Sequence, residues 1–213
     1  MNKIFEPADS VLLNEIMRHR RDVRGNRFTD KKIPSDVIDK LLDAALLAPS
    51  VGYSQPWQFV VIEDDNIKQK VYDSFCEQTE YAANLFSDQK QQQYKKLKLE
   101  GIKEAPVNIA VFYQPSQEPV LGQTSMNEMG KFSVVCAIQN MWLMARTLNV
   151  GIGWVSIVEP QKVKAAVNAP KESELIGYLC VGYVNEFLDE PELKKVSWNQ
   201  QKNKQDVVFK NKF

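Results

Sequence analysis

Four short apolar runs, rich in β-branched and aromatic residues, constrain the fold of this 213-residue chain more than any other feature. Each run is bounded by polar or turn-forming residues and is predicted to be a buried strand. Helical stripes separate the runs without a strict strand–helix alternation, which favours an α+β sandwich over a doubly wound parallel sheet. The four expected strands are residues 57–62, 107–113, 152–158 and 175–184.

Helices are predicted wherever apolar residues recur at a spacing of three or four. The clearest stripe runs through Leu41 and Ala45, with Ser35 as the predicted N-cap and Pro49 as the stop. The apolar stretch 132–148 predicts a helix that is buried on several sides or lies at a subunit interface. Further helices are predicted from a cap at Asp9 to His19, through residues 67–75 and over residues 160–168.

The chain carries 27 basic and 27 acidic residues, so any anion site has to be local. No 18 consecutive residues are apolar and the N-terminus lacks a secretory signal, which predicts a cytoplasmic protein without a membrane or nucleic-acid partner. No linker divides the chain, so residues 1–213 are expected to form one domain. Cys76, Cys136 and Cys180 lie far apart with no CxxC motif, which predicts reduced, mostly buried thiols.

His19 is the only histidine of the chain. Metal sites built on two or three imidazoles are therefore excluded within one chain, and a Ser-His-Asp triad would have to use His19 without any GxSxG elbow. A chain short of its own acid–base and redox groups, yet with an organised polar site, indicates that a bound cofactor supplies the chemistry.

The segment "HRRDVRGNRF" places Arg20, Arg21, Arg24 and Arg27 around Asp22, next to the predicted end of a helix. Guanidinium forks match phosphate oxygens, so the cluster could hold a phosphate. The alternative is a solvated basic face paired with nearby carboxylates. Between cations, the Asp22 carboxyl is expected to have a lowered pKa and to act as a hydrogen-bond acceptor or weak base, or as half of a helix-terminal ion pair.

Two further segments carry small and polar residues that could face a ligand. In "APSVGYSQPW" backbone and amide donors could approach a flat heterocycle closely, although an ordinary helix–strand turn would have the same composition. "GIGWVS" lacks the third glycine of a dinucleotide fingerprint and opens a strand, so it fails as that motif. Ser156 at its end is expected to lie in the strand.

Two polar regions flank these elements. Residues 78–100 carry scattered apolar positions and are expected to form an exposed helix or a mobile cover over the site. The tail 187–213 loses periodicity but contains Trp198, and it is expected to wrap a partner subunit.

Taken together, "RRDVRGNRF", "APSVGYSQPWQFVVI", "YKKLKLEGIKEAPVNIAV", "VVCAIQNMWLMARTLNVGIGWVSI" and "LCVGYVNEFLDEPEL" resemble the flavin-dependent nitroreductase superfamily. Within it they are similar to the branch of 5,6-dimethylbenzimidazole synthases, and the match covers almost the whole chain. The resemblance implies a homodimer of nitroreductase-like α/β/α sandwiches with a central, mostly antiparallel sheet, an extended C-terminal tail, and FMN bound between the subunits.

The resemblance also implies roles for individual residues. Asp22, from the family's RRDVR motif, and Ser156, from its GWVS motif, would be catalytic, and the cover segment would close over the flavin. The residues implied to bind the cofactor are Arg20, Arg21, Asp22, Val23, Arg24, Pro49, Ser50, Leu97 and Ser156.

The reaction implied for this branch consumes its flavin. Reduced FMN, supplied by a separate flavin reductase, reacts with O2 and is fragmented to 5,6-dimethylbenzimidazole and erythrose 4-phosphate. Two alternatives stay open at this point: an NAD(P)H-dependent nitroreductase or flavin reductase that recycles FMN, and a flavin-binding protein without catalytic activity.

The chain departs from the family pattern in two segments. "QTSMNEMGKFS" replaces a Thr-His pair and a Met-Asp-Leu-Tyr-Ser run, and "WNQQKNK" replaces Trp-Arg-x-Arg. Asn199 and Gln201 thus stand where the family has two cations, and Lys202 or Lys204 is expected to substitute as a point charge. The affected positions of the first segment are Ser125, Gly130 and Phe132.

Overall fold

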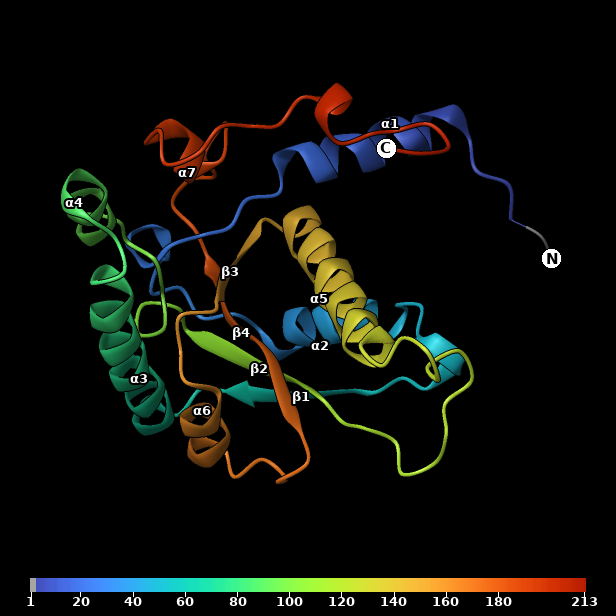
Figure 1. Ribbon diagram of the computed structural model, residues 1–213, viewed down its shortest axis with the longest axis horizontal. Helices are drawn as coiled ribbons and strands as arrows, with labels where there is room; N and C mark the ends of the chain where they lie inside the picture. Colours follow the sequence, from blue (N-terminus) through green and yellow to red (C-terminus); the bar gives the residue numbers. More distant parts are fainter. Residues whose placement is uncertain (1–2) are drawn as a thin grey trace.

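The computed structural model describes residues 3–213, the side chain of Asp88 excepted. Its strands form one sheet in the order β1-β2-β4-β3, and every neighbouring pair is antiparallel (Figure 1). The first two strands match the prediction to the residue, and the other two match it within three residues. The strands are β1 Trp57–Ile62, β2 Val107–Tyr113, β3 Val150–Val155 and β4 Glu174–Tyr183.

Helices cover both faces of this sheet. The α-helices are α1 Pro7–His19, α2 Ser35–Leu46, α3 Asp65–Ala83, α4 Asp88–Lys95, α5 Met129–Thr147, α6 Pro160–Ala166 and α7 Glu192–Lys195, and the 3-10 turns are η1 Gly25–Arg27, η2 Val51–Tyr53 and η3 Lys204–Asp206. One core cluster joins α2 and α5 to the sheet, and a second joins α3 and α6 to its other face. This arrangement confirms the predicted α/β/α sandwich.

The sequence of β2 explains how one strand serves both cores. Val107, Ile109 and Val111 belong to the cluster under α2 and α5, while Ala110 and Phe112 belong to the cluster under α3 and α6. Successive side chains of a strand point to opposite faces, so a strand buried on both sides has to be apolar throughout. The whole of β2 is buried accordingly.

Two predicted helix caps are off by a few residues. Asp9 is not the N-cap of α1, because Pro7 already occupies the first turn and Glu6 is the cap. The Asp9 carboxylate instead accepts a hydrogen bond from the Glu6 N–H at 2.8 Å and completes a capping box. Ser35 is the first helical residue of α2, and Pro34 precedes it as the cap.

The prediction of mostly buried thiols is wrong. Cys180 in β4 is buried, but Cys76 on α3 and Cys136 on α5 are exposed. Both exposed cysteines lie on the outer face of a helix whose opposite face fills the core, so their apolar character does not place them inside.

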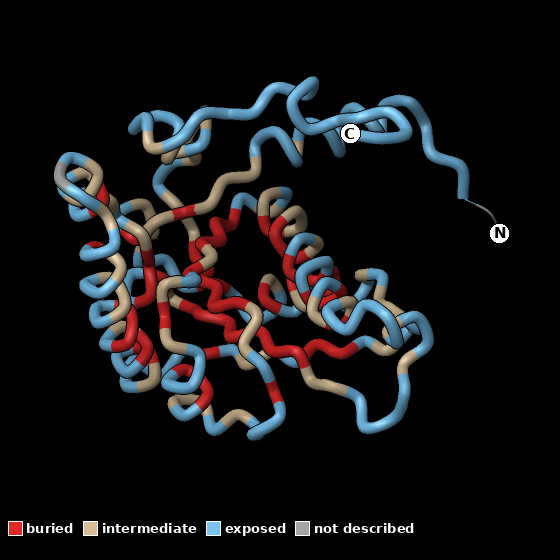
Figure 2. Tube along the Cα trace, viewed as in Figure 1, coloured by how far each residue is buried: buried red, intermediate tan, exposed pale blue. Residues whose placement is uncertain are grey.

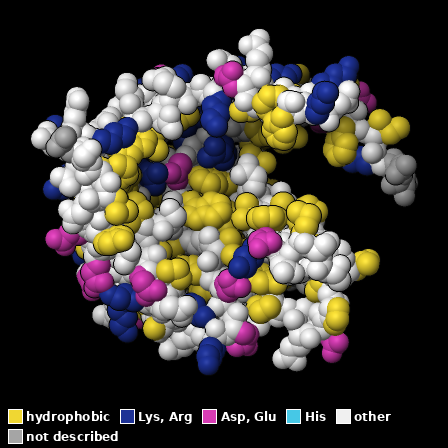
Figure 3. All heavy atoms as spheres, in the orientation of Figure 1, with side chains coloured by type: hydrophobic (Ala, Val, Ile, Leu, Met, Phe, Trp, Pro, Cys, Tyr) yellow, Lys and Arg dark blue, Asp and Glu magenta, His cyan; other side chains and the backbone are white. Residues whose placement is uncertain are grey.

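In the view of Figure 1, helix α1 and the C-terminal tail lie at the same edge of the molecule, and Figure 2 shows that both are exposed along most of their length. Figure 3 shows apolar side chains gathered on this arm, with a hollow between the arm and the body. Among residues 3–213, no helix has the length and hydropathy needed to cross a bilayer. The exposed large apolar residues of the arm are Ile4, Phe5, Val11, Leu12, Leu13, Met17, Val207, Val208, Phe209 and Phe213.

Candidate functional site

The arginine segment is attached to the free edge of β3. The Val23 N–H donates to the Ile152 carbonyl oxygen at 3.0 Å, and Asp22 forms a parallel bridge with Ile152. One step further along β3, the Trp154 N–H donates to Asp22 Oδ1 at 2.9 Å. The carboxylate is therefore positioned by the main chain of the sheet.

The two glycines of "GIGWVS" make this attachment possible. A side chain at Gly153 would collide with the Val23 carbonyl oxygen, and one at Gly151 would come within 2.5 Å of a Val184 methyl group. Glycine inside a strand commonly marks a close approach of another backbone. The "GIGWVS" motif, which fails as a dinucleotide fingerprint, is thus the part of β3 on which the arginine segment packs.

The other side of the segment is bonded to the end of the predicted cover. The Gly25 N–H donates to the Glu100 carbonyl at 2.7 Å, and Arg24 Nη1 donates to the Leu99 carbonyl at 3.1 Å. Glu100 itself is 2% exposed, and its side chain is paired with Lys98 at 2.5 Å. The arginine segment therefore bridges the sheet edge and residues 99–100 of the cover.

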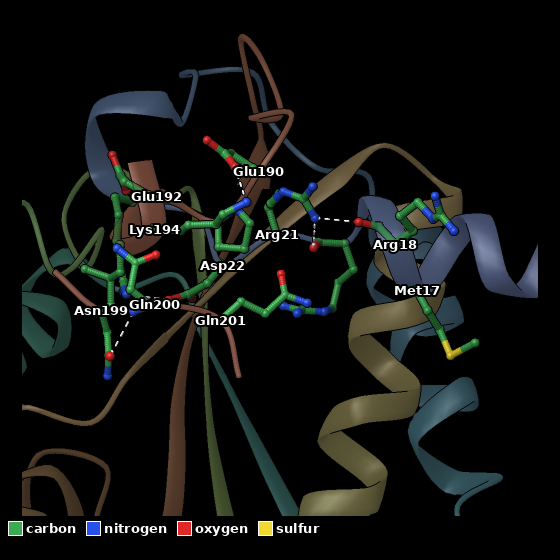
Figure 4. A pocket seen from close by; sticks show the side chains of 14 residues that line it. Met17, Arg18, Arg21, Asp22, Glu190, Glu192, Lys194, Asn199, Gln200 and Gln201 are labelled. Carbon is green, nitrogen blue, oxygen red and sulfur yellow. Dashed lines mark hydrogen bonds and ion pairs between the residues drawn. The ribbon is translucent and has the colours of Figure 1, made fainter. Parts of the chain in front are cut away.

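A cavity of about 640 Å³ opens beside this segment. It is lined by the end of α1, the arginine segment, residues 190–194 and residues 199–201. Figure 4 shows Asp22 and Gln201 in the middle, Asn199 and Gln200 on one side and Arg18 and Met17 on the other. A volume of this size is typical of small-molecule sites. The structure thus brings four predicted site residues together: Arg20, Arg21, Asp22 and Arg24.

The cavity lining is suited to an anion. Five cationic side chains face three acidic ones, so the balance is positive. Arg21 Nη1 donates to two carbonyl oxygens, of Arg18 at 2.6 Å and of Arg20 at 2.7 Å, and its Nη2 donates to Asp189. The remaining donor, Nε, is buried without a partner among residues 3–213. Arg20 lies over the Trp142 ring at 4.6 Å, and burial lowers the pKa of its guanidinium.

The prediction of a lowered pKa for Asp22 is wrong. Burial raises the pKa of this carboxyl, and it outweighs the opposing effects of the Arg24 guanidinium, the Trp154 N–H and Arg20. Arg24 does form the expected ion pair with Asp22. The sequence shows the neighbouring charges, but it does not show that folding removes water from the carboxyl group. The predicted direction of the pKa shift was therefore wrong.

The other predicted site residues do not line the cavity. Val23 is buried beneath it, and Leu97 is half-buried just after α4. Ser156 is exposed and, contrary to prediction, follows β3 instead of lying within it. Strand pairing of β3 with β4 ends at Val155, which leaves the serine outside the ladder.

Pro49 and Ser50 lie at the opposite end of α5 from the arginines. The turn after them is fixed by the Val51 N–H, which donates to Ser133 Oγ at 3.1 Å, whereas Arg146 bonds the His19 carbonyl at 3.0 Å. Ser133 and Arg146 are 13 positions apart along α5, which corresponds to about 20 Å. One copy of the chain therefore keeps the two predicted parts of the site apart.

The loop after Ser50 is strained. Tyr53 and Gln55 have φ of 54° and 46°, a left-handed conformation that is uncommon for non-glycine residues. Tyr53 is also 83% exposed. Backbone strain of this kind clusters at binding and active sites.

Sequence reasoning missed some of the lining. Lys194 lies in the cavity, whereas Lys202 and Lys204, the expected replacement cations, do not. Asn199 and Gln201 do line it, as their alignment with the family's cations suggested. The irregular tail sequence held no periodic signal by which Lys194 could have been found.

The departure at Gly130 has a structural counterpart. A side chain at Gly130 would come within 2.5 Å of the Tyr113 ring, so the tyrosine fills the space beside the first turn of α5. Tyr113 OH in turn accepts a hydrogen bond from Gln123 at 3.1 Å.

Comparison with known proteins supports the family resemblance. A sequence profile of the nitroreductase family matches residues 17–183. The chain is 39% identical over 201 residues to the 5,6-dimethylbenzimidazole synthase of Rhodospirillum rubrum. The aligned residues cover 93% of this chain and 94% of that relative.

Two solved structures share the fold. An iodotyrosine deiodinase bound to FMN and 3-iodo-L-tyrosine superposes with a TM-score of 0.74 at 22% identity, over 94% of this chain and 100% of that chain. A BluB-like flavoprotein from Clostridium difficile 630 superposes with a TM-score of 0.70 at 21% identity, over 94% of this chain and 99% of that one. With its sheet order, its two helical layers and a profile match over most of its length, the chain belongs to the nitroreductase family.

Proposed function

We propose that this protein is a 5,6-dimethylbenzimidazole synthase that fragments reduced FMN with O2. The observation that carries the proposal is a carboxylate held by the main chain inside a cavity rich in arginines, in a chain 39% identical to such a synthase. Erythrose 4-phosphate is the second product. A separate flavin reductase supplies reduced FMN, and the reaction takes place in the cytoplasm.

The cavity fits the phosphate end of FMN. Arg20 and Arg21 line the cavity and supply guanidinium groups that match phosphate oxygens. Asn199 and Gln201 add amide groups that suit ribityl hydroxyls. The flavin ring, when bound, supplies the electrons for the reaction with O2.

Asp22 is the proposed base that takes a proton from C1′ of the ribityl chain. Burial raises the pKa of its carboxyl, which makes the carboxylate a stronger proton acceptor than an exposed aspartate. The Trp154 N–H fixes its orientation. Ser156 follows on the same segment with an exposed hydroxyl and is the proposed second proton-handling group.

A second copy of the chain completes the site in this proposal. The exposed apolar side chains of α1 and the tail form the dimer contact, and the part of the tail beyond residues 196–201, which contact this copy's own α4 and cavity, wraps the partner. The strained loop with Ser50 and the exposed Tyr53, about 20 Å from the arginines within one copy, meets the flavin bound by the other copy. The cover, with Leu97, closes over the ring and excludes water.

The decisive experiment supplies anaerobically reduced FMN, admits air and measures 5,6-dimethylbenzimidazole. The wild-type protein is expected to form it, whereas Asp22→Asn and Ser156→Ala lose product formation but keep FMN binding. Arg21→Ala is expected to lose FMN affinity instead. A parallel reaction supplies oxidised FMN and NAD(P)H: nucleotide oxidation with FMN returned intact, and no 5,6-dimethylbenzimidazole in either reaction, would identify a recycling flavin reductase and overturn the proposal.

A further inference from the structure

The C-terminal tail is anchored to the cover helix by one aromatic side chain. Trp198 is half-buried, whereas most residues on either side of it are exposed. Its ring meets Phe86 edge to face, with centroids 5.4 Å apart, and lies 6.2 Å from the Tyr94 ring. Phe86 and Tyr94 in turn lie 5.1 Å apart, so the three rings form one cluster between α4 and the tail.

Polar contacts fix the same junction. Lys90 Nζ lies 3.7 Å from the centroid of the Trp198 ring and donates to the Trp198 carbonyl oxygen at 2.9 Å. Gln93 Nε2 donates to the Val196 carbonyl at 2.8 Å. Both donors come from α4, whose mean hydropathy is too low to bury the helix on the sheet by itself. The tail is therefore a main support of α4.

The backbone conformation just before Trp198 fixes the position of this residue. Ser197 has φ of 55°, and the Trp198 N–H donates to the Leu193 carbonyl at 2.8 Å, which closes the end of α7. A left-handed residue at this place usually is glycine, so the serine is held there by its surroundings. The turn ends α7 and starts the segment that crosses from α4 to the arginine cavity.

The next three residues of the tail line that cavity. Asn199, Gln200 and Gln201 follow Trp198 directly and face the arginine segment across the cavity (Figure 4). One peptide bond thus separates the residue that contacts α4 from the first residue that lines the cavity. The contact with α4 and the cavity lining are therefore adjacent parts of one short segment.

We propose that Trp198 is a positioning residue that couples the cover helix α4 to the arginine cavity. An anion held by the arginines and the tail amides fixes residues 199–201, and Trp198 then holds α4 closed. The ligand of this coupling rests on the proposed function, whereas the junction between Trp198 and α4 does not. Among the described residues, Trp198 is not part of the cavity lining, so it acts through α4 and the tail.

Hydrogen–deuterium exchange of the α4 amides tests the coupling. In ligand-free protein, Trp198→Ala is expected to speed α4 exchange about tenfold, the effect of losing aromatic and cation contacts, and Trp198→Phe restores most of the protection. Saturating FMN is expected to slow α4 exchange in the wild type and in Trp198→Phe, but not in Trp198→Ala. Leu121→Ala removes an exposed apolar side chain outside the cover and outside the cavity lining, and it serves as the control, with wild-type behaviour in both arms.

A second measurement separates coupling from loss of local packing. By linkage, the Kd for FMN in Trp198→Ala rises by the same factor by which FMN slows α4 opening in the wild type. If FMN does not bind, inorganic phosphate is the second probe: slowed α4 exchange in the wild type but not in Trp198→Ala keeps the coupling while the proposed function fails. The coupling is overturned if neither probe slows α4 exchange in the wild type, or if a probe slows it equally in Trp198→Ala.

Discussion

The carboxylate of Asp22 accepts a hydrogen bond from the backbone N–H of Trp154, with 2.9 Å between the two atoms. This bond joins a loop residue to a strand residue 132 positions later in the chain. Because the donor belongs to the main chain, the position of the carboxylate depends on the course of β3 and survives changes of the Trp154 side chain. The proposed catalytic base is thus built into the edge of the sheet.

Gly153→Ala is expected to break this arrangement. The new methyl group would collide with the Val23 carbonyl oxygen, so the arginine segment has to move off the sheet edge. A loss of about 2 kcal/mol in the free energy of unfolding is expected, typical of an overpacked site, together with weaker FMN binding. Urea unfolding and FMN titration check this. Gly151→Ala is the milder control, since its methyl group meets side-chain methyls that can shift, and equal losses in the two variants would contradict the explanation.

Asp22→Asn should change the pH dependence of stability. Burial raises the pKa of Asp22 above its ordinary value of about 3.9, so the folded protein holds the proton more tightly than the unfolded chain. The ionised carboxyl therefore destabilises the fold near neutral pH, and this effect disappears as the pH falls through the raised folded pKa. Because Asp22→Asn also removes the ion pair with Arg24, the expected outcome is a trend with pH: the unfolding free energy of wild type in urea rises relative to that of Asp22→Asn from about pH 7 to about pH 4.

Asp36→Asn is the control for the pH series of Asp22→Asn, because the pKa of Asp36 is shifted in the opposite direction. The hydrogen bond from Lys40 lowers the pKa of Asp36, so its ionised form stabilises the fold above the ordinary pKa and that contribution is lost on acidification. Wild type is expected to exceed Asp36→Asn in stability near neutral pH and to approach it in acid. The same trend in both variants would argue against a raised Asp22 pKa.

Asn199→Arg is expected to strengthen FMN binding about tenfold, the effect of one charge-assisted hydrogen bond. The position lines the cavity and corresponds to a cation in the family pattern, so a guanidinium there adds a phosphate donor. Fluorescence titration of FMN at two salt concentrations measures the gain, which should diminish as salt rises. Lys202→Arg, outside the cavity lining, is the control without effect, and an unchanged Kd for Asn199→Arg would place the phosphate elsewhere.

Leu12→Lys tests the proposed contact between two copies. Leu12 lies on the exposed apolar face of α1, and burying an unpaired ammonium there is expected to weaken the dimer at least tenfold and to lower FMN affinity with it. Sedimentation and FMN titration measure the two effects. Glu15→Lys, at an exposed polar position of the same helix, should leave the dimer intact. A Leu12→Lys variant with wild-type assembly and affinity would refute this contact.

Much of the fold could be predicted because the residues of the core are the apolar residues that recur at strand or helix spacing along the sequence. β1 and β2 were predicted to the residue, since each is a continuous apolar run bounded by polar residues. Arg20, Arg21, Asp22 and Arg24, which the sequence grouped in one segment, do meet in one cavity, while their role as an anion site stays a prediction. Gly151 and Gly153, the two glycines before Trp154, also indicate that another backbone segment approaches β3 closely. The comparison with the dinucleotide fingerprint drew attention away from this meaning.

The remaining features depended on contacts between distant parts of the chain. Cys76 and Cys136 are exposed because other faces of their helices pack on the sheet. The α1 cap, by contrast, is a local feature: Pro7 fixes the start of the helix, so Glu6 is the cap. The tail gave no periodic signal, so its placement of residues 199–201 opposite the arginines could not be predicted from local pattern.

The sequence by itself determined the strands, most helices, the family and the charge types of the site, because these follow from the local order of apolar, charged and glycine residues. Only the tertiary structure decided the environment of Asp22, where burial outweighs neighbouring cations, and the junction between Trp198 and α4. Both arise from segments that are far apart in the chain. Water is excluded from Asp22, and the rings around Trp198 come into contact, only after the chain has folded.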